Sequence, residues 1–122
     1  MSIKDRIAIV TGAGRGVGRA TAQLFVREGA QVVLFSRTQA HLEQTHAEIT
    51  RNGGHALTIV GDVSREEDVQ TLFQKVRDTY GRVDILVNCA GIVAVRPFVE
   101  MDTATWDRVV GVNLRGTFLC CR

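Results

Sequence analysis

Several features that mark other classes of protein are scarce or missing in this sequence. Its 122 residues include one proline, and a composition of 45% hydrophobic and 23% charged residues is typical of a folded chain rather than a disordered one. The net charge is only +2 and basic residues are interspersed with acidic ones, so no basic face for nucleic acid is indicated. No apolar run reaches the length of a membrane span, and the first residues lack the pattern of a signal peptide. We therefore expect a cytoplasmic protein that binds neither nucleic acid nor membranes.

The cysteines and histidines show no pattern of a disulfide framework or a metal site. The three cysteines lack Cys-x-x-Cys spacing, and the adjacent pair Cys120 and Cys121 could form a disulfide only with strain, so we expect these two and Cys89 to be reduced thiols. No cysteine or carboxylate completes a ligand set with the histidines, so we expect solvated surface residues and no metal. The histidines are His41, His46 and His55.

The rest of the chain is organised around segment 11–18, Thr-Gly-Ala-Gly-Arg-Gly-Val-Gly. It follows the apolar run 7–10 and precedes a helical pattern of apolar residues. A strand, a glycine turn and a helix N-terminus together predict an anion site, because unpaired amides and the positive end of the helix dipole face the bound group. The alternative is an ordinary glycine-rich turn. The cofactor-binding residues that we expect here are Thr11, Gly12, Gly14, Arg15, Gly16, Val17 and Gly18.

Strand-like and helix-like segments alternate four times along the chain. The expected strands cover residues 6–10, 31–36, 55–61 and 83–89. The expected helices cover about 17–28, about 39–52, a segment from a capping box at Ser64 and Glu67 to Gly81, and a segment from about Thr103. Apolar strands separated by helices predict a parallel sheet covered on both faces and doubly wound by right-handed crossovers. We predict a single α/β domain over residues 1–122, a Rossmann-like sheet truncated after about four strands in the order 3-2-1-4.

The end of the second expected strand predicts a phosphate site. Ligands of doubly wound sheets bind beyond the carboxyl ends of the strands, and Ser36-Arg37 stands where an adenosine ribose would lie. A carboxylate there would repel a 2′-phosphate, whereas the guanidinium fork of Arg37 matches phosphate oxygens. Arg15, in the glycine turn, can reach the same phosphate from the other side. This pattern favours NADP over NAD; the alternative is that Arg37 is a solvated helix-start residue and Arg15 an exposed loop residue.

Residues that follow the third and fourth expected strands extend this nucleotide site. Asp62 offers a carboxylate next to the backbone amide of Val63, which suits the amino group and a ring nitrogen of adenine. Asp62 taken alone would equally be part of the turn before Ser64. Segment 88–91, Asn-Cys-Ala-Gly, is small enough to leave room for a cofactor, and its asparagine amide can tie strand and loop together. The residues assigned here to cofactor binding are Ser36, Arg37, Asp62, Val63, Asn88, Ala90 and Gly91.

Asn113 is an unusual residue for the middle of the last expected helix. Its side chain competes with the backbone for hydrogen bonds, and Gly111 and Gly116 weaken the helix further. A helix loosened in this way can hold water against freed carbonyl groups, which is useful in a proton path. The alternative is a buried amide whose hydrogen bonds are satisfied within the protein.

Together, these residues closely resemble the N-terminal half of a short-chain dehydrogenase/reductase, the type that includes 3-oxoacyl-(acyl carrier protein) reductases. The matching segments, which cover essentially the whole chain in the family's order, are Thr11-Gly12-x-x-x-Gly16-x-Gly18, Asp62-Val63, Asn88-Cys89-Ala90-Gly91 and Val112-Asn113-Leu114-x-Gly116. The resemblance implies carbonyl/alcohol hydride transfer, with the pyrophosphate at the glycine turn, adenine at Asp62 and Val63, and the 2′-phosphate at Arg15 and Arg37. It implies that Asn113 is the family's catalytic asparagine, which supports a water-mediated proton relay. Cys89 departs from the family, which more often has a second asparagine there.

The family's reaction also needs a serine that holds the carbonyl, a Tyr-x-x-x-Lys pair and further strands that build the substrate pocket. The one tyrosine, Tyr80, has Asp84 four residues on, and the lysines are Lys4 and Lys75. We therefore expect the cofactor-binding part of an NADP-dependent oxidoreductase, a fragment that is inactive alone. A small carbonyl or alcohol substrate and a homo-oligomeric state are expected of the complete enzyme. Because a half-sheet leaves a strand edge and apolar faces uncovered, we expect the isolated chain to be marginally stable, aggregation-prone or completed by another polypeptide.

Two other interpretations compete with a fragment of an enzyme. A non-catalytic module of this length would bind NADP(H) tightly without turnover. A scaffold would use the exposed sheet edge to bind a partner or itself, and a charge in the fourth strand would abolish that binding but not NADPH binding.

Overall fold

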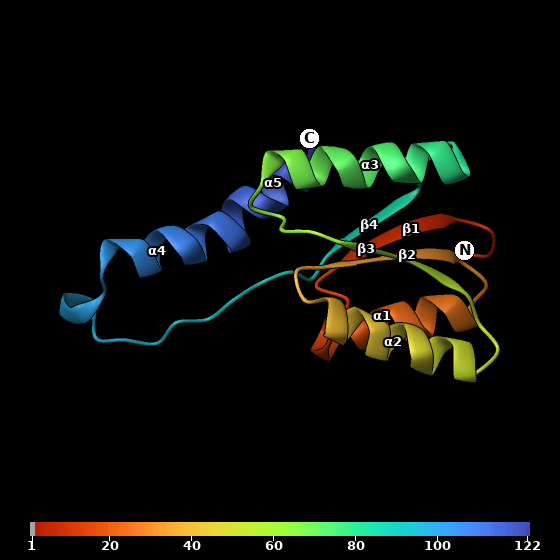
Figure 1. The fold of residues 1–122 in the computed structure, drawn as a ribbon, viewed down its shortest axis with the longest axis horizontal. Helices are drawn as coiled ribbons and strands as arrows, with labels where there is room; N and C mark the ends of the chain where they lie inside the picture. The colour runs from red at the N-terminus through yellow and green to blue at the C-terminus, as the bar shows by residue number, and fades with distance from the viewer. Residues whose placement is uncertain (1) are drawn as a thin grey trace.

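The strand β1 (Ile7–Thr11) is buried at all five positions because another strand pairs with it on each side. The computed structural model describes residues 2–122, and its sheet is parallel with the strand order β3-β2-β1-β4 (Figure 1). The other strands are β2 (Gln31–Ser36), β3 (Ala56–Val60) and β4 (Ile85–Asn88). The α/β class, the four parallel strands and their order are as predicted.

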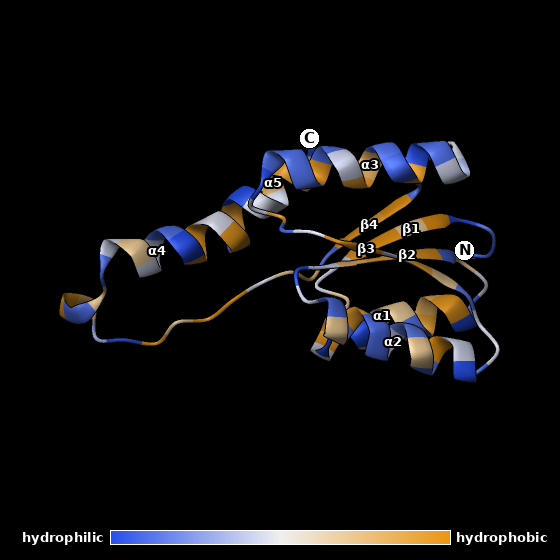
Figure 2. Ribbon diagram, viewed as in Figure 1, coloured by the Kyte–Doolittle hydropathy of each residue, from blue (hydrophilic) through white to orange (hydrophobic). Residues whose placement is uncertain are grey.

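Helices cover both faces of this sheet, which explains why its central strands are continuously apolar. The helices α1 (Gly16–Arg27) and α2 (Gln39–Arg51) lie against one face, and α3 (Glu66–Tyr80) lies on the other with α5 (Gly116–Cys121) (Figure 1). Figure 2 shows the strands as the most hydrophobic layer, with polar residues on the outer sides of the helices. The three helix–strand alternations before β4 therefore follow the predicted pattern.

Successive strand side chains point to opposite faces and form two separate apolar cores. The core on the side of α1 and α2 includes Val10, Val32, Leu34, Ala22, Leu42 and Ile49. The core under α3 and α5 includes Ile9, Val33, Phe35, Leu72, Val76 and Leu119. Because neighbouring residues of one strand serve different cores, the sheet is fixed in register from both sides.

Asp84 determines where the sheet begins at β4. Its backbone N–H donates to the carbonyl oxygen of Ile7 at 2.9 Å, and its carboxylate accepts from the Ile7 N–H at 2.8 Å. The hydrogen bond from Ile7 and that from the Arg82 guanidinium hold the pKa of the Asp84 carboxyl below its ordinary value. β4 therefore begins at Ile85 and not at the predicted Val83, and it ends at Asn88, one residue before the predicted end.

The capping box predicted at Ser64 and Glu67 is wrong. The N-cap of α3 is Arg65, whose side chain makes no capping hydrogen bond. The Ser64 hydroxyl and N–H both donate to Oδ1 of Asp62, at 2.7 and 2.9 Å, so Ser64 belongs to a turn before the helix and not to its N-cap. The acidic residues of the first turn of α3 complement the helix dipole instead.

After β4 the chain leaves the sheet and returns through a long helical segment (Figure 1). It contains the single turn η1 (Phe98–Glu100), the helix α4 (Thr103–Val110), a π-helical turn η2 (Gly111–Arg115) and then α5. Asp102 caps α4, since its carboxylate accepts from the Thr105 N–H at 2.6 Å. No helix within residues 2–122 has the length and apolarity that crossing a membrane requires.

Apolar side chains are exposed along this segment. Its exposed large apolar residues are Val93, Val95, Phe98, Val99, Trp106, Leu114 and Phe118. Figure 2 shows hydrophobic colour on the segment between β4 and α4 as well as on the sheet. The exposure agrees with the expectation that part of the apolar surface is uncovered in this chain.

Candidate functional site

A cavity of about 300 Å³ opens where the carboxyl ends of β1 and β2 meet the N-terminus of α1. This is the edge of a doubly wound sheet at which ligands bind, and the volume is that of a small-molecule site. Of the residues predicted to form the site, those that line the cavity are Gly12, Gly14, Arg15, Gly16, Val17, Gly18, Ser36, Arg37, Val63, Ala90 and Gly91. Thr11, Asp62, Asn88 and Asn113 lie outside its lining.

Gly12 is at the point where the loop after β1 touches the loop after β4. Its φ is +63°, and a Cβ on it would lie 2.7 Å from the backbone of Cys89 and from the N atom of Ala90. Both the backbone conformation and the space therefore require glycine. The close packing of these two loops forms the floor of the cavity.

The side chain of Thr11 connects these two loops through hydrogen bonds. Its side-chain oxygen accepts hydrogen bonds from the N–H groups of Cys89 and Ala90, both at 3.2 Å, and donates to the Val87 carbonyl oxygen at 3.4 Å. The tie between strand and loop that was expected from Asn88 is thus made by Thr11. The Asn88 amide instead lies 3.4 Å from Sγ of Cys121 on α5.

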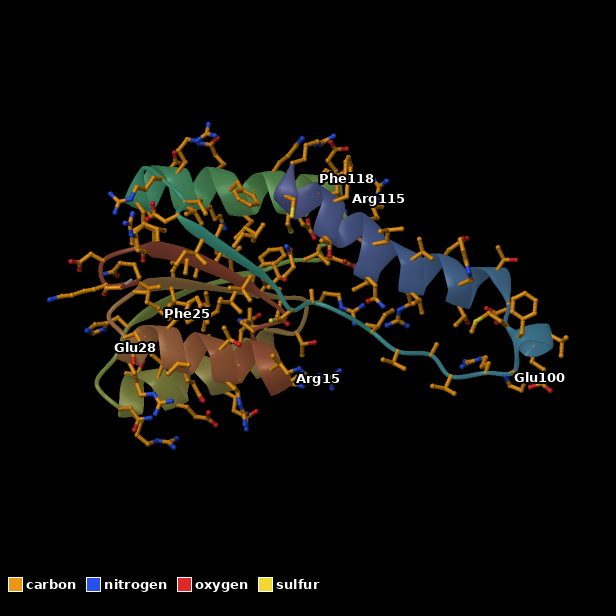
Figure 3. The ribbon with its side chains drawn as sticks, turned by 180° about the vertical axis from the view of Figure 1, so that it is seen from behind. Arg15, Phe25, Glu28, Glu100, Arg115 and Phe118 are labelled. Carbon is orange, nitrogen blue, oxygen red and sulfur yellow. The ribbon has the colours of Figure 1, made fainter. Side chains whose placement is uncertain are left out.

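Arg15 and Arg37 both line the cavity. Arg15 precedes α1, and Figure 3 shows it at the end of α1 that faces the segment leaving β4. Both side chains are exposed, and neither guanidinium makes an ion pair or a hydrogen bond with residues 2–122. Among residues 2–122, no aspartate or glutamate lines the cavity, so the charged side chains of its lining are cationic.

The first turns of α1 and α2 add to this positive character. Neither helix has an acidic residue in its first turn, and the N-cap residues Arg15 and Thr38 make no side-chain capping bond. By contrast, α3 has three acidic residues in its first turn. Uncapped amides at the edge of the cavity are suited to an anion.

Of the three histidines expected at the solvated surface, His55 is exposed, whereas His41 and His46 are half-buried. His41 is half-buried and lines the cavity from the first turn of α2. The other lining residues that were not predicted are Phe35, Thr38, Gly61, Cys89, Ile92 and Val112. The sequence did contain a signal for His41. The helix after β2 begins at the same sheet edge as the glycine turn, so residues in its first turn lie close to the site.

Asp62 and Val63 have different surroundings. Val63 is buried, lines the cavity and packs closely on Gly116, where a Cβ would lie 2.5 Å from Val63 Cγ2. Asp62 forms the turn before Ser64, and its N–H donates to the Asp68 carboxylate at 2.8 Å. Asp62 is therefore in the turn that was the alternative for it, while its role toward adenine stays a prediction.

Asn113 lies in the π-helical turn, so the prediction of a locally loosened helix is confirmed. Its amide donates to the Ile92 carbonyl oxygen at 2.9 Å, and its Oδ1 accepts from the Ile92 N–H at 2.8 Å. The Thr117 hydroxyl donates to the Asn113 carbonyl oxygen at 3.0 Å, so this freed carbonyl already has one protein partner. Asn113 thus acts on the cavity through Ile92, which lines it.

The three cysteines are free thiols with different environments. Cys89 lines the cavity, Cys121 is exposed and Cys120 is buried. Burial, together with the neighbouring Cys121, raises the pKa of Cys120 to about 11. Cys120 is therefore a neutral core residue at ordinary pH.

Comparison with known proteins places this cavity in a familiar context. A family model described as short chain dehydrogenase matches residues 6–122. The short-chain reductase protein NovJ of Streptomyces niveus is 41% identical over 117 residues, which are 96% of this chain and 45% of NovJ. A short-chain type dehydrogenase/reductase structure from Mycobacterium marinum superposes with a TM-score of 0.94 at 32% identity, over 98% of this chain and 49% of that one.

Another solved structure, the citronellol catabolism dehydrogenase AtuB of Pseudomonas aeruginosa, superposes with a TM-score of 0.93 at 36% identity, over 98% of this chain and 49% of AtuB. The chain spans about half the length of the curated relatives that it matches. The match includes all four strands and the cavity, because it covers nearly the whole of the present chain.

Proposed function

The chain belongs to the short-chain dehydrogenase family, and we propose that it is the NADP-binding part of an oxidoreductase that transfers hydride between the cofactor and a small carbonyl or alcohol. The observation that carries this proposal is the cavity at the ends of β1 and β2, lined by the glycine loop and by two arginines without a carboxylate partner. Residues 1–122 form, on this proposal, a single nucleotide-binding domain.

The cofactor's pyrophosphate would lie against the glycine loop. Residues of the loop and of the first turn of α1 line the cavity, and the helix dipole favours a negative group there. A Cβ on Gly18 would lie 2.1 Å from the Gly12 carbonyl oxygen, so the loop packs tightly on α1 and keeps its amides in place. This is the cradle in which a pyrophosphate fits.

Arg15 and Arg37 would bind the 2′-phosphate of NADP. They have no partners among the described residues, so binding breaks no existing ion pair. Each charge-assisted hydrogen bond is worth about 1.5–3 kcal/mol, which corresponds to a preference for NADP over NAD of about tenfold or more. On this proposal the chain would prefer NADP to NAD.

The adenine would lie near Asp62 and Val63. Val63 lines the cavity with an apolar surface, and Oδ2 of Asp62 has no hydrogen-bond partner within residues 2–122. That oxygen is available to the adenine amino group, while Oδ1 holds the turn. One carboxylate would therefore have both a structural and a binding role.

The nicotinamide end would pass over the small residues Ala90 and Gly91. A Cβ on Gly91 would lie 3.3 Å from Oδ1 of Asn113, which places this end of the cavity beside the π-helical turn. Asn88 is at the last position of β4, paired in register with Thr11. NADPH supplies hydride when bound, and Asn113 would hold the loop through Ile92 and support a proton relay.

Hydride transfer to a carbonyl also requires a proton donor. The sequence holds no Tyr-x-x-x-Lys pair, since Tyr80 is its one tyrosine and Lys4 and Lys75 its lysines. We expect the 122 residues alone to bind NADPH but not to turn over a substrate. Carbonyl-dependent NADPH oxidation is expected of a polypeptide that carries the remaining residues as well.

Self-association is a further expectation for the complete enzyme. Trp106 and Phe118 are each 57% exposed on the helical segment that follows β4. Exposed aromatic side chains of this size favour an interface. Sedimentation velocity of the complete enzyme, as wild type and as Trp106→Glu, tests this expectation. An unchanged distribution of oligomeric species argues against the interface.

Fluorescence titration with NADPH and NADH tests the cofactor proposal. We expect Arg15→Ala and Arg37→Ala each to weaken NADPH binding by about tenfold and to leave NADH binding unchanged. Arg51→Ala, at the opposite end of α2, is the matched control and keeps the wild-type preference. A wild-type protein that binds both nucleotides equally contradicts NADP specificity. Tight NADPH binding with no turnover by a natural 122-residue product favours the non-catalytic module.

A further inference from the structure

His41 is in contact with the glycine loop because residue 14 has no side chain. A Cβ on Gly14 would lie 2.6 Å from His41 Cβ and 3.3 Å from the Ser36 hydroxyl oxygen. Gly14 therefore admits the first turn of α2 against the loop, and His41 enters the cavity wall between the loop and the end of β2.

The charged groups that share the cavity with His41 are cations. Arg15 reaches it from the glycine loop and Arg37 from the connection between β2 and α2, and the lining residues in the described chain include no aspartate or glutamate. His41 is thus the third basic side chain of one anion-binding wall.

The carboxylates of α2 itself are engaged elsewhere. Glu43 accepts a hydrogen bond from Gln39 at 3.0 Å. Glu48 accepts from Gln23 at 2.6 Å and lies 3.7 Å from the Arg19 guanidinium, both of which belong to α1. Within residues 2–122 the imidazole of His41 therefore has no acidic partner, so an anionic ligand is the partner that its position suits.

We propose that His41 binds the 2′-phosphate of the cofactor together with Arg15 and Arg37, and that it does so as the imidazolium. This inference rests on the proposed NADP site. A bound phosphate dianion favours the protonated ring, so the imidazole takes up one proton from solvent as NADPH binds. The preference for NADPH over NADH is therefore greater at low pH than at high pH, within the range in which histidine titrates.

Dissociation constants for NADPH and NADH at about pH 6.5 and about pH 8.5 test the proposal. In the wild type we expect the preference for NADPH to fall by about threefold to tenfold between these values, because one proton is coupled to binding. His41→Gln should weaken NADPH by about tenfold at the lower pH, remove this extra pH dependence and leave NADH unchanged. His41→Lys should keep tight NADPH binding but lose the pH dependence, since its charge does not titrate there.

His46→Gln is the matched control, because His46 is on the same helix but does not line the cavity. The 2′-phosphate itself titrates near pH 6, and this contribution is common to all variants. If wild type and His41→Gln show the same preference for NADPH and the same pH dependence, the role of His41 is overturned. The proposed NADP site is not affected by that result. A wild type without preference for NADPH overturns the NADP proposal and this inference together.

Discussion

Asn113 and Ile92 are joined by two hydrogen bonds, from the Asn113 amide to the Ile92 carbonyl oxygen at 2.9 Å and from the Ile92 N–H to Asn113 Oδ1 at 2.8 Å. One side chain thereby satisfies both backbone groups of a residue 21 positions earlier. The contact connects the irregular segment after β4 to the helical segment that returns to the sheet. It gives Asn113 a structural role that is separate from any role in proton transfer.

Asn113→Ala should loosen the segment after β4 without unfolding the sheet. Two hydrogen bonds are lost, at a cost of about 1–2 kcal/mol, but the affected groups are exposed and water replaces the partner. Hydrogen–deuterium exchange should show lost protection at Ile92 and unchanged protection in β1. Leu114→Ala, at the adjacent exposed position, is the control and should leave Ile92 protected. Unchanged exchange at Ile92 in Asn113→Ala would show that the pair does not hold the segment.

Gly12→Ala should be among the most damaging small substitutions in the chain. The added Cβ meets backbone atoms of Cys89 and Ala90 at 2.7 Å in a left-handed conformation, and we expect a loss of about 2–4 kcal/mol together with loss of NADPH binding. Gly53→Ala is the matched control, since Gly53 also has a positive φ, +84°, but nothing within 4 Å of an added Cβ. It should cost only about 1 kcal/mol. Urea unfolding compares the two, and equal losses would mean that backbone strain rather than loop contact is what matters at Gly12.

The fold was predictable because its signals are local and repeated. Each central strand is a short apolar run followed by a glycine turn or a helical pattern. Continuously apolar strands must be covered on both faces of the sheet, and strands connected by helices achieve this in a parallel sheet. The strand ends were less predictable, because they depend on single side chains. The carboxylate of Asp84 occupies the Ile7 N–H at 2.8 Å and so moves the start of β4, which no periodicity could reveal.

The site residues could be predicted where a strand end or a glycine turn fixes their position. They could not be predicted where their position depends on packing between elements. Arg15 and Arg37 follow from the position of the glycine turn and the end of β2, and both line the cavity. His41 was missed because its place depends on the contact with Gly14, which joins two elements that are distant in sequence. At Asp62 the sequence left two roles open, a turn and a contact with a ligand, and the structure shows the turn.

The unfolding free energy should depend on pH through Asp84. Its pKa in the folded protein is lowered by the hydrogen bond from Ile7 and by that from Arg82, so the stability that it contributes is complete above the ordinary aspartate pKa. That stability is lost as pH falls through the lowered value, because protonation then weakens both contacts. Asp84→Asn does not titrate and should flatten the acid side of a plot of unfolding free energy against pH. Asp107→Asn, an exposed aspartate on α4, should retain the wild-type slope, and a wild-type slope in Asp84→Asn would contradict this role.

The adjacent thiols of Cys120 and Cys121 should react at very different rates. Cys120 is buried with a pKa raised to about 11, whereas Cys121 is exposed beside the Asn88 amide. At about pH 8 a thiol of pKa about 11 is ionised to about 0.1%, so the thiolate of Cys120 that reacts is scarce and its alkylation is slow. Alkylation with iodoacetamide followed by peptide mass spectrometry should label Cys121 first and Cys120 only with unfolding. Cys121→Ser isolates the buried thiol, and rapid labelling of Cys120 in that folded variant would mean that α5 detaches readily from the sheet.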